Sequence, residues 1–248
     1  MNRPSIQRYS HASCDQPQRL LKAEKIIRIL KMLRPLAGQR VLEIGTGSGV
    51  IAAALAEQVG RDGAVISVDI VDQRIVHAGY QFLKIDNAHL PLSTASFDLV
   101  VSNQVIEHVG DHTEQLTHLR EIHRVLSPNG IGYLAAPNRW AILEPHYRLP
   151  FLSWLPQLLA DAYVRAARRG SVYDCYPPGP LKLRRMLRAA GLRWATMAGQ
   201  AVKIMASLDD GPWPNRVAAR MPTVVIDSLS GILPTTILVL RKAQPSAS

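Results

Sequence analysis

The sequence predicts an α/β domain with a mostly parallel sheet and helices on both of its faces. Short buried strands and amphipathic helices alternate from residue 40 to residue 137, and such alternation is typical of parallel sheets. A glycine-rich turn, Gly45 to Gly49, follows the first strand and opens a helix. The chain has 248 residues and a hydrophobic content of 47%, which suits one large domain with a sizeable core.

The helices before and within this alternation have clear signals. Residues 16–35 show apolar side chains at helical spacing and end at a proline. An alanine-rich stretch, residues 48–60, predicts a helix that ends at its last glycine. Residues 112–130 predict a helix that stops at Pro128 and Gly130.

Runs of apolar and β-branched residues predict the strands. The expected strands cover residues 39–45, 64–70, 80–86, 96–103, 131–137, 192–199 and 235–242. Only residues 71–79 separate the second run from the third, so a helix between them is short or absent. In such sheets ligands bind at the carboxyl ends of the strands. The residues that follow each strand are therefore the candidates for a site.

A single domain is expected to span residues 1–248. Its core comprises residues 38–137 and 181–242, and residues 138–180 form a cap inserted between these two parts. The ends that are expected to be frayed are residues 1–15 and 243–248.

The inserted cap contains one predicted helix, residues 156–169, with a proline in its first turn and a glycine beyond its end. The apolar face of this helix consists of Leu155, Leu158, Leu159, Ala162, Tyr163 and Ala166. Arginines crowd its last turn, where cations suit the helix dipole. The next helix is expected over residues 181–191.

The formal net charge of +10 is concentrated late in the chain, since residues 141–248 carry 14 Lys and Arg but 6 Asp and Glu. Such a field favours anionic partners or serves solubility alone. The N-terminal residues lack a signal-peptide core, and the longest apolar run near the C-terminus, residues 228–240, is too short to span a bilayer. Cys14 and Cys175 do not form a disulfide framework or a metal-ligand pair. We therefore expect a cytoplasmic protein, with a peripheral position at the inner face of the membrane as the alternative.

The stretch VLEIGTGSGV, which contains the glycine turn, nearly matches the G-x-G-x-x-G loop of dinucleotide-binding enzymes. Gly45 and Gly47 fit, but the third glycine falls at Gly49, one position early, and Val50 follows it. In a dinucleotide loop, N–H groups at the helix start face a pyrophosphate. The carboxylate of Glu43, two residues before the loop, suits a ligand with a positive amino group instead.

Polar side chains also follow the next three strands. Asp69 ends the second strand and can accept hydrogen bonds from two ribose hydroxyls. Asp86 and Asn87 end the third strand, where a carboxylate and a backbone N–H can read an adenine edge. Asn103 and Gln104 end the fourth strand and face the same cleft. Together these strand ends suit a ligand that combines an amino acid, a ribose and an adenine.

This combination resembles the class I S-adenosylmethionine-dependent methyltransferases, and the small-molecule group that includes ubiquinone and menaquinone biosynthesis enzymes is the most similar. The motifs that carry the resemblance are VLEIGTGSG, VDI, IDNAHLPLSTASFDLVVSNQVIEHV and LREIHRVLSPNG, over residues 38–137, and the final strand TTILVLRK also fits. The resemblance implies a Rossmann-like seven-stranded sheet with strand order 3-2-1-4-5-7-6 and strand 7 antiparallel. It also implies an enzyme that uses S-adenosyl-L-methionine as its cofactor.

The resemblance further implies a role for each residue at the strand ends. The residues that would line the methionine part of the cofactor are Glu43, Gly45, Thr46, Gly47 and Gly49. Asp69 would bind the ribose, and Ile70 beside it is a less defined contact because the helix after the second strand is short or absent. The residues expected near the adenine are Asp86 and Asn87. Asn103 is expected near the sulfonium, and Gln104 beside it is a further cofactor-binding candidate.

Methyl transfer from a sulfonium is an in-line displacement that positioning can accelerate. A general base is needed only when the acceptor holds a proton that it cannot easily lose. His108 is the candidate base, and the alternative is that it packs against or caps the following helix. The candidates for acceptor binding, unless they form a solvated loop, are Arg139, His146, Tyr147, Arg148 and Tyr173. No metal site is expected, because the histidines are scattered along the sequence.

The expected function is methyl transfer to a small-molecule or lipid-linked acceptor, with oxygen slightly favoured because of His108. The inserted helix would be a lid over the acceptor, or would contact an anionic membrane through residues 151–169. An RNA methyltransferase and a non-catalytic cofactor-binding protein stay as alternatives, whereas a nicotinamide oxidoreductase conflicts with the glycine spacing. Nucleic acid is not an expected partner, since the chain shows no RNA-binding module, and the oligomeric state stays open.

Overall fold

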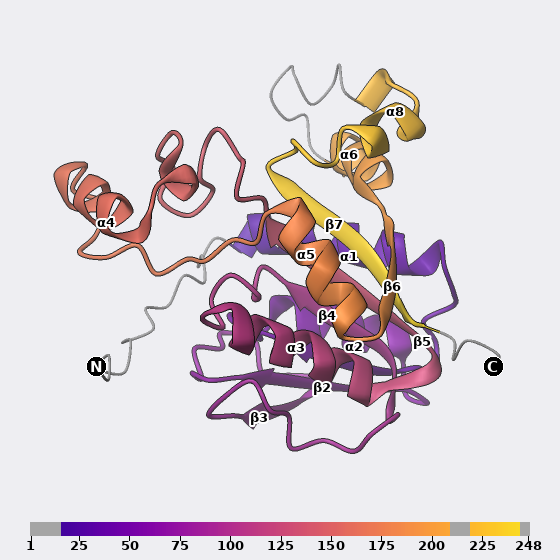
Figure 1. The fold of residues 1–248 in the computed structure, drawn as a ribbon. Helices are drawn as coiled ribbons and strands as arrows, with labels where there is room; N and C mark the ends of the chain where they lie inside the picture. The colour runs from indigo at the N-terminus through magenta and orange to yellow at the C-terminus, as the bar shows by residue number, and fades with distance from the viewer. Residues whose placement is uncertain (1–15, 209–218, 244–248) are drawn as a thin grey trace, which may run out of the picture.

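The computed structural model describes residues 16–208 and 219–243, which form a seven-stranded sheet with helices on both faces (Figure 1). The strands are β1 (Arg40–Ile44), β2 (Ala64–Asp69), β3 (Gln81–Lys84), β4 (Phe97–Asn103), β5 (Leu126–Pro137), β6 (Leu192–Thr196) and β7 (Thr235–Lys242). The helices are α1 (Gln16–Lys31), α2 (Val50–Val59), α3 (His112–Val125), η1 (Leu152–Trp154), α4 (Gln157–Ala166), α5 (Pro180–Ala189), α6 (Ala198–Leu208) and α8 (Thr223–Ser228). Of the two ends predicted to be frayed, residues 1–15 and 244–248 lie outside the described residues.

The sheet has the strand order β3-β2-β1-β4-β5-β7-β6. Strand β7 is antiparallel to both of its neighbours, and the other neighbouring strands pair in parallel. The structure thereby confirms the predicted fold class, including the strand order and the orientation of strand 7. The carboxyl ends of β1 to β5 therefore meet along one edge of the sheet.

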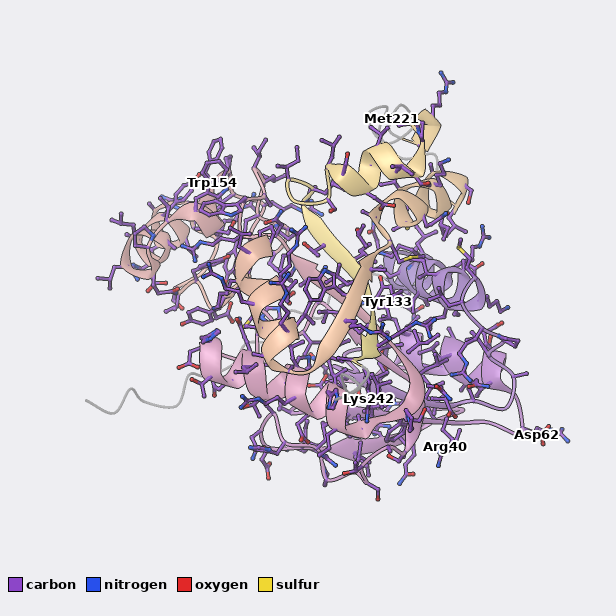
Figure 2. The ribbon with its side chains drawn as sticks, turned by 45° about the vertical axis from the view of Figure 1, so that its right-hand side comes forward. Arg40, Asp62, Tyr133, Trp154, Met221 and Lys242 are labelled. Carbon is purple, nitrogen blue, oxygen red and sulfur yellow. The ribbon has the colours of Figure 1, made fainter. Side chains whose placement is uncertain are left out.

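Two separate cores lie on the two faces of the sheet, because successive strand residues point in opposite directions. Leu42 and Val100 belong to the core under α3 and α5, while Val41 and Leu99 belong to the core under α1 and α2. Tyr133 of β5 is 1% exposed and lies inside the second core, as Figure 2 shows. Both faces of the central strands are thus buried, which explains their nearly continuous apolar sequence.

Residues 138–179, called the lobe below, form a small unit beside the sheet (Figure 1). Its buried apolar residues are Leu149, Leu152, Ala160, Val164, Tyr173 and Cys175. Trp154 is 42% exposed and lies on the outer side of the lobe, away from Tyr133 in the sheet (Figure 2). The lobe therefore does not complete either of the two cores.

Helix α4 of the lobe is shorter than predicted. It ends at Ala166 because Arg168 has a φ of 56°, in the left-handed region that interrupts an α-helix. Ala160 is buried, whereas Leu158 is 82% exposed and Leu159 is 58% exposed. The apolar face predicted from the sequence therefore lies mostly at the surface.

Helix α3 also ends earlier than predicted, at Val125 instead of Pro128. A residue that precedes proline is driven towards an extended conformation. Leu126 already has an extended backbone, with φ −60° and ψ 136°, and pairs with Phe97 as the first residue of β5. Strand β5 therefore begins five residues before the predicted residue 131.

The boundary between β6 and α6 differs from the prediction as well. The strand ends at Thr196, and Gly199 lies in the first turn of α6. The Gly199 N–H donates to Asp227 Oδ1 at 2.8 Å, so a contact from α8 caps this turn. Near the N-terminus, α1 ends at Lys31, before the predicted residue 35.

No helix lies between β2 and β3 in the described chain, as the short spacing predicted. The connecting residues instead lie against the glycine turn. The N–H groups of Ile75 and Val76 donate to the Ser48 carbonyl oxygen at 3.0 and 3.1 Å, and the Tyr80 hydroxyl donates to the Val76 carbonyl oxygen at 2.5 Å. These hydrogen bonds therefore hold the segment of residues 70–80 against the glycine turn.

Candidate functional site

The glycine turn between β1 and α2 has a backbone shape that few other residues adopt. Gly45, Gly47 and Gly49 have φ values of 86°, 51° and 82°, and positive φ favours glycine. A Cβ atom at Gly49 would overlap the Val76 carbonyl oxygen and the Tyr80 hydroxyl. The absence of a Cβ at the third glycine therefore makes room for a neighbouring segment of the chain.

A buried chain of polar groups lies beneath the turn. Ser67 Oγ donates to Glu43 Oε2 at 2.6 Å, and it lies 2.6 Å from Thr46 Oγ1. Burial raises the pKa of the Glu43 carboxyl to about 8, against the opposing effects of the Ser67 hydrogen bond and the Arg19 charge. The carboxyl is therefore mostly protonated at neutral pH, and a cation beside it would favour its ionised form. The sequence reasoning missed Ser67, although a hydroxyl inside a buried strand is the signal that could have identified it.

Asp69 ties the end of β2 to the glycine turn. The Gly47 N–H donates to Asp69 Oδ2 at 2.9 Å, and the Ile70 N–H donates to Oδ1 at 2.7 Å. Each carboxylate oxygen offers two lone pairs. Oδ1 also accepts the Val71 N–H at 3.3 Å, so Oδ2 is the oxygen that keeps capacity for a further donor such as a ribose hydroxyl.

The ends of β3 and β4 are less enclosed. Asp86 and Asn87 are exposed, and Asn87 Oδ1 accepts the His89 N–H at 2.8 Å. Asn103 is half-buried at the end of β4, and Gln104 after it has a φ of 59°. These residues share one edge of the sheet with Asp69, but the adenine-side candidates lie on its open part.

Four side chains converge beside the end of β4. Cys175 Sγ lies 3.8 Å from His108 Nδ1, and the rings of His108 and His146 pack edge to face with centroids 5.0 Å apart. Buried Glu107 places its Oε1 atom 3.4 Å from His146 Nε2 and 3.9 Å from His108 Nε2. Burial lowers the pKa of His146, but Glu107 and Glu144 outweigh this effect and raise that pKa above its usual value. The sequence reasoning selected the two histidines separately and missed Glu107 and Cys175.

The other acceptor candidates do not gather with His146. Tyr147 and Tyr173 pack edge to face inside the lobe, with ring centroids 5.4 Å apart. Arg148 is exposed, and the guanidinium of Arg139 lies 5.9 Å from a neighbouring tryptophan ring. Of the five candidates, His146 is the one that lies against Glu107 and His108.

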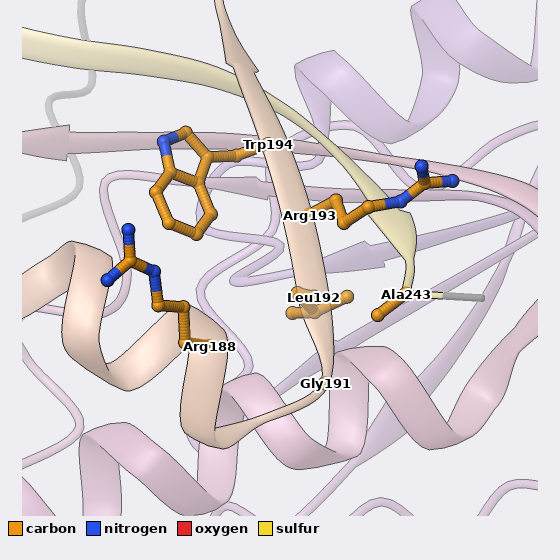
Figure 3. A pocket seen from close by; sticks show the side chains of 6 residues that line it. All are labelled: Arg188, Gly191, Leu192, Arg193, Trp194 and Ala243. Carbon is orange, nitrogen blue, oxygen red and sulfur yellow. The ribbon is translucent and has the colours of Figure 1, made fainter. Parts of the chain in front are cut away.

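A hollow of about 430 Å³ lies at the other edge of the sheet (Figure 3). It is lined by Arg188, Gly191, Leu192, Arg193, Trp194 and Ala243. The Arg188 guanidinium lies 5.6 Å from the centre of the Trp194 ring. Because Leu192 pairs with Lys242 at the end of β7, the hollow lies on the amino-terminal side of the parallel strands, opposite the glycine turn.

The chain is similar to known proteins over the region that carries these features. Residues 42–134 match the family model described as a methyltransferase domain. The chain is 33% identical over 200 residues to a probable S-adenosylmethionine-dependent methyltransferase of Mycobacterium tuberculosis, which covers 74% of this chain and 66% of that protein. The chain belongs to the S-adenosylmethionine-dependent methyltransferases. Family membership confirms the recognition, the enzyme class and the cofactor expected from the sequence.

One further curated relative and one solved structure are similar to this methyltransferase over different shares of their lengths. It is 35% identical over 115 residues to a ubiquinone biosynthesis O-methyltransferase of Ruegeria pomeroyi, which covers 43% of this chain and 44% of that protein. A solved S-adenosylmethionine-dependent methyltransferase of Mesorhizobium loti shares the fold, with a TM-score of 0.58 and 16% identity over 90% of this chain and 100% of that one. The matches span 40% to 66% of the length of the curated relatives. Among the described residues, no helix has the length and apolar character that a bilayer crossing requires.

Proposed function

We propose that this methyltransferase holds S-adenosylmethionine at the carboxyl ends of β1, β2, β3 and β4 and methylates a small-molecule or lipid-linked acceptor. The observation that supports this most strongly is the arrangement of the glycine turn. Its backbone contacts the Asp69 carboxylate, and the polar chain of Glu43, Ser67 and Thr46 lies beneath it. One small region thus offers groups for an ammonium, a carboxylate and a ribose.

The residues of the turn fit the amino-acid part of the cofactor. The buried Glu43 carboxyl has a pKa near 8, so a bound ammonium would convert it to a carboxylate at neutral pH. Backbone N–H groups at the start of α2 suit a ligand carboxylate, because the N-terminus of a helix attracts anions. The residues proposed to hold this part are Glu43, Gly45, Thr46, Gly47 and Gly49.

The nucleoside part is assigned to the next strand ends. Asp69 would accept hydrogen bonds from ribose hydroxyls while its backbone donors keep it in place. Ile70 would lie beside the ribose, on a side that carries no helix. The residues proposed for the adenine are Asp86 and Asn87, and those proposed for the sulfonium are Asn103 and Gln104.

S-adenosylmethionine supplies an electrophilic methyl group when it is bound. The protein would contribute mainly position, because aligned reactants lose much of the entropic barrier to displacement. His108 follows β4 and its side chain is 24% exposed, so it can receive a proton from an acceptor hydroxyl. Glu107 Oε1, 3.9 Å from His108 Nε2, would stabilise the resulting imidazolium. These contacts favour oxygen as the methylated atom, in keeping with the O-methyltransferase named among the relatives.

The surface of the lobe supports a lipid-linked acceptor. Its exposed large apolar side chains are Trp140, Ile142, Leu143, Phe151, Trp154, Leu158, Leu159 and Val172. Exposed arginines lie among them in sequence, at Arg165, Arg168 and Arg169. Apolar and basic groups on one surface segment suit peripheral membrane contact. We therefore propose that residues 151–169 bring the enzyme to the surface where such an acceptor resides.

Calorimetry with S-adenosylhomocysteine and with NADH tests the cofactor assignment. We expect S-adenosylhomocysteine to bind and NADH not to bind, and the opposite result would overturn the proposal. Asp69→Asn should weaken S-adenosylhomocysteine binding by about tenfold or more, because hydrogen bonds to charged groups are worth about 1.5–3 kcal/mol. Asp62→Asn, at an exposed turn, is the matched control. Unchanged affinity in Asp69→Asn would remove the ribose assignment.

Transfer of a labelled methyl group tests the acceptor. Purified enzyme is incubated with labelled cofactor and, separately, with aqueous metabolites, a total lipid extract or total RNA. Label in a metabolite or lipid fraction supports the proposal, and mass spectrometry then identifies the product. Label in RNA alone would favour the RNA methyltransferase alternative, and binding of S-adenosylhomocysteine without transfer to any fraction would favour a non-catalytic protein.

A further inference from the structure

Two parts of the chain that are distant in sequence place ligand-type side chains at one point. His108 comes from the loop after β4, whereas His146 and Cys175 come from the lobe. One potential ligand atom from each residue lies within 4.8 Å of the other two. Sequence spacing gave no sign of this cluster, because 67 positions separate His108 from Cys175.

One of the three distances in the cluster is close to that of a metal-bound pair. A tetrahedral Zn²⁺ site has Zn–N bonds of about 2.0–2.1 Å and Zn–S bonds of about 2.3 Å. Two such ligand atoms lie roughly 3.5 Å apart by simple trigonometry on those bond lengths. Cys175 Sγ and His108 Nδ1 are 3.8 Å apart. A shift of a few tenths of an ångström would therefore suit this pair to an ion, and the His146 ligand atom, within 4.8 Å of both, would have to move closer to complete the site.

A buried carboxylate lies behind the two imidazoles. Glu107 is 0% exposed, and its Oε1 atom is 3.4 Å from His146 Nε2 and 3.9 Å from His108 Nε2. Histidines that bind metals commonly direct their other ring nitrogen to a carboxylate, which fixes the tautomer. For His108 this leaves Nδ1, the nitrogen nearer to Cys175, directed at the cluster.

The charges around the cluster also favour a cation. Glu107 and Glu144 are buried, and Asp174 adjoins Cys175. A bound cation would offset this concentration of acidic groups.

We propose that His108, His146 and Cys175 bind a transition-metal ion of the Zn²⁺ class, with Glu107 orienting the imidazoles. Imidazole and thiolate together suit zinc and related ions better than Mg²⁺ or Ca²⁺. Binding would release the thiol proton of Cys175 to solvent as the sulfur–metal bond forms. A fourth position would be left for water.

The ion would fasten the lobe to the loop after β4. The two are already joined at this point, because the Tyr176 N–H donates to the Glu107 carbonyl oxygen at 2.7 Å. Gln115 Nε2 also donates to the carbonyl oxygens of Ile106 and Tyr176, at 3.2 and 2.7 Å. An ion at the cluster would add a third connection. With the ion bound, His108 Nδ1 would be a ligand and not the site of proton transfer.

Cobalt titration of the full chain tests this site. Co²⁺ bound to a thiolate gives a charge-transfer band in the near ultraviolet, and tetrahedral Co²⁺ gives intense visible bands. Protein stripped with a chelator, in a Cys14→Ser background, should show both signals with one equivalent of Co²⁺. Zn²⁺ should abolish both signals by competition. The absence of a thiolate band in this protein would overturn the proposal.

Two variants and a control locate the ligands. Cys175→Ser should abolish the charge-transfer band, and His146→Gln should weaken Co²⁺ binding by at least tenfold. His112→Gln, at an exposed histidine in the first turn of α3, should bind Co²⁺ like the parent. Co²⁺ binding that is unchanged in both Cys175→Ser and His146→Gln would place the ion elsewhere and overturn the assignment.

The same samples are titrated with S-adenosylhomocysteine. Retained S-adenosylhomocysteine binding shows that a variant is folded, so a lost cobalt signal then reports on the metal ligands. Should Cys175→Ser fail to fold, the parent protein and His146→Gln decide the question. Loss of cobalt binding and loss of cofactor binding are separate readouts, so this proposal and the proposed methyl transfer can fail independently.

Discussion

The glycine-turn region and the lobe are built in different ways. The turn is formed mainly by backbone groups. Three glycines have positive φ, and a carboxylate is held by N–H groups of the turn and of the residue that follows β2. In the lobe, side chains connect segments distant in sequence, as when Tyr147 Oη donates to Asp174 Oδ1 at 2.8 Å and Asp161 Oδ1 accepts the Tyr173 N–H at 2.8 Å.

This difference separates two tasks. A site made of backbone tolerates few substitutions, because each glycine and each amide has a fixed neighbour. A unit held by side chains around a small core, with exposed apolar residues outside, can change its surface while its attachment stays. We therefore expect substitutions at the turn to affect stability and cofactor binding together, and substitutions in the lobe to leave cofactor binding intact.

The largest effect is expected for Gly49→Ala. The new Cβ would overlap the Val76 carbonyl oxygen and the Tyr80 hydroxyl at a φ of 82°. Left-handed φ and overpacking together cost about 3 kcal/mol. Chemical denaturation should show this loss, and calorimetry should show weaker S-adenosylhomocysteine binding.

Gly38→Ala is the control for Gly49→Ala. Gly38 has a φ of 71° and no atom within 4 Å of an added Cβ. Its substitution should cost only about 1–2 kcal/mol from the backbone term and leave S-adenosylhomocysteine affinity unchanged. Equal losses in the two variants would show that steric overlap at Gly49 does not matter.

A pH-dependent effect is expected for Glu43→Gln. Burial raises the Glu43 pKa to about 8, so the folded protein holds a proton that the unfolded chain releases near pH 4. The stabilisation is complete at low pH and is lost as pH rises through about 8. Relative to Glu43→Gln, the free energy of unfolding of the wild type should therefore fall by roughly 1 kcal/mol per pH unit between about pH 5 and about pH 8. Denaturation of both proteins from pH 5 to pH 9 measures this, and parallel curves would contradict the assignment.

In the lobe, Val164→Ala should lower local stability without changing the site. Val164 is fully buried in the small core of the lobe, and removal of two methyl groups costs about 2 kcal/mol. Limited proteolysis should cut the lobe faster, while S-adenosylhomocysteine affinity should stay within twofold. A tenfold loss of affinity would show that the two regions are coupled.

The smallest effect on stability is expected for the double variant Leu158→Ser/Leu159→Ser. Both side chains are mostly exposed, so the free energy of unfolding should change by no more than about 0.5 kcal/mol. Flotation with anionic vesicles should nevertheless show weaker binding by several-fold, because the apolar contact is reduced. Ala162→Ser on the same helix is the control, and equal flotation of all three proteins would remove the membrane proposal.

The sequence was sufficient for the features that depend on neighbours in the chain. The glycines, Asp69 and Glu43 lie at or near strand ends, and in a parallel sheet all such ends meet at one edge. Ser67 needed one further fact, the register that pairs Glu43 with Ser67. No local pattern encodes that register, because several alignments of two apolar strands bury similar side chains.

The lobe could not be predicted in the same way. Helix α4 has two faces that could pack, and its own sequence does not show which one is buried. In the structure, Ala160 and Val164 pack into the small core of the lobe. The contact between Cys175 and His108 depends on the path of the chain between two residues that are 67 positions apart in sequence. Hydrophobic periodicity and motif spacing carry no information on such a long-range contact.

The two ends of the lobe lie side by side. A Cβ added at Gly179 would lie 3.9 Å from Arg139 Cβ and 3.4 Å from Trp140 Nε1. Since each doubling of a loop between such ends costs only about 0.6 kcal/mol, segments of very different length can occupy this position. Evolution or protein engineering can therefore replace the whole lobe by a segment of another length. The strands that precede the lobe can keep their sequence.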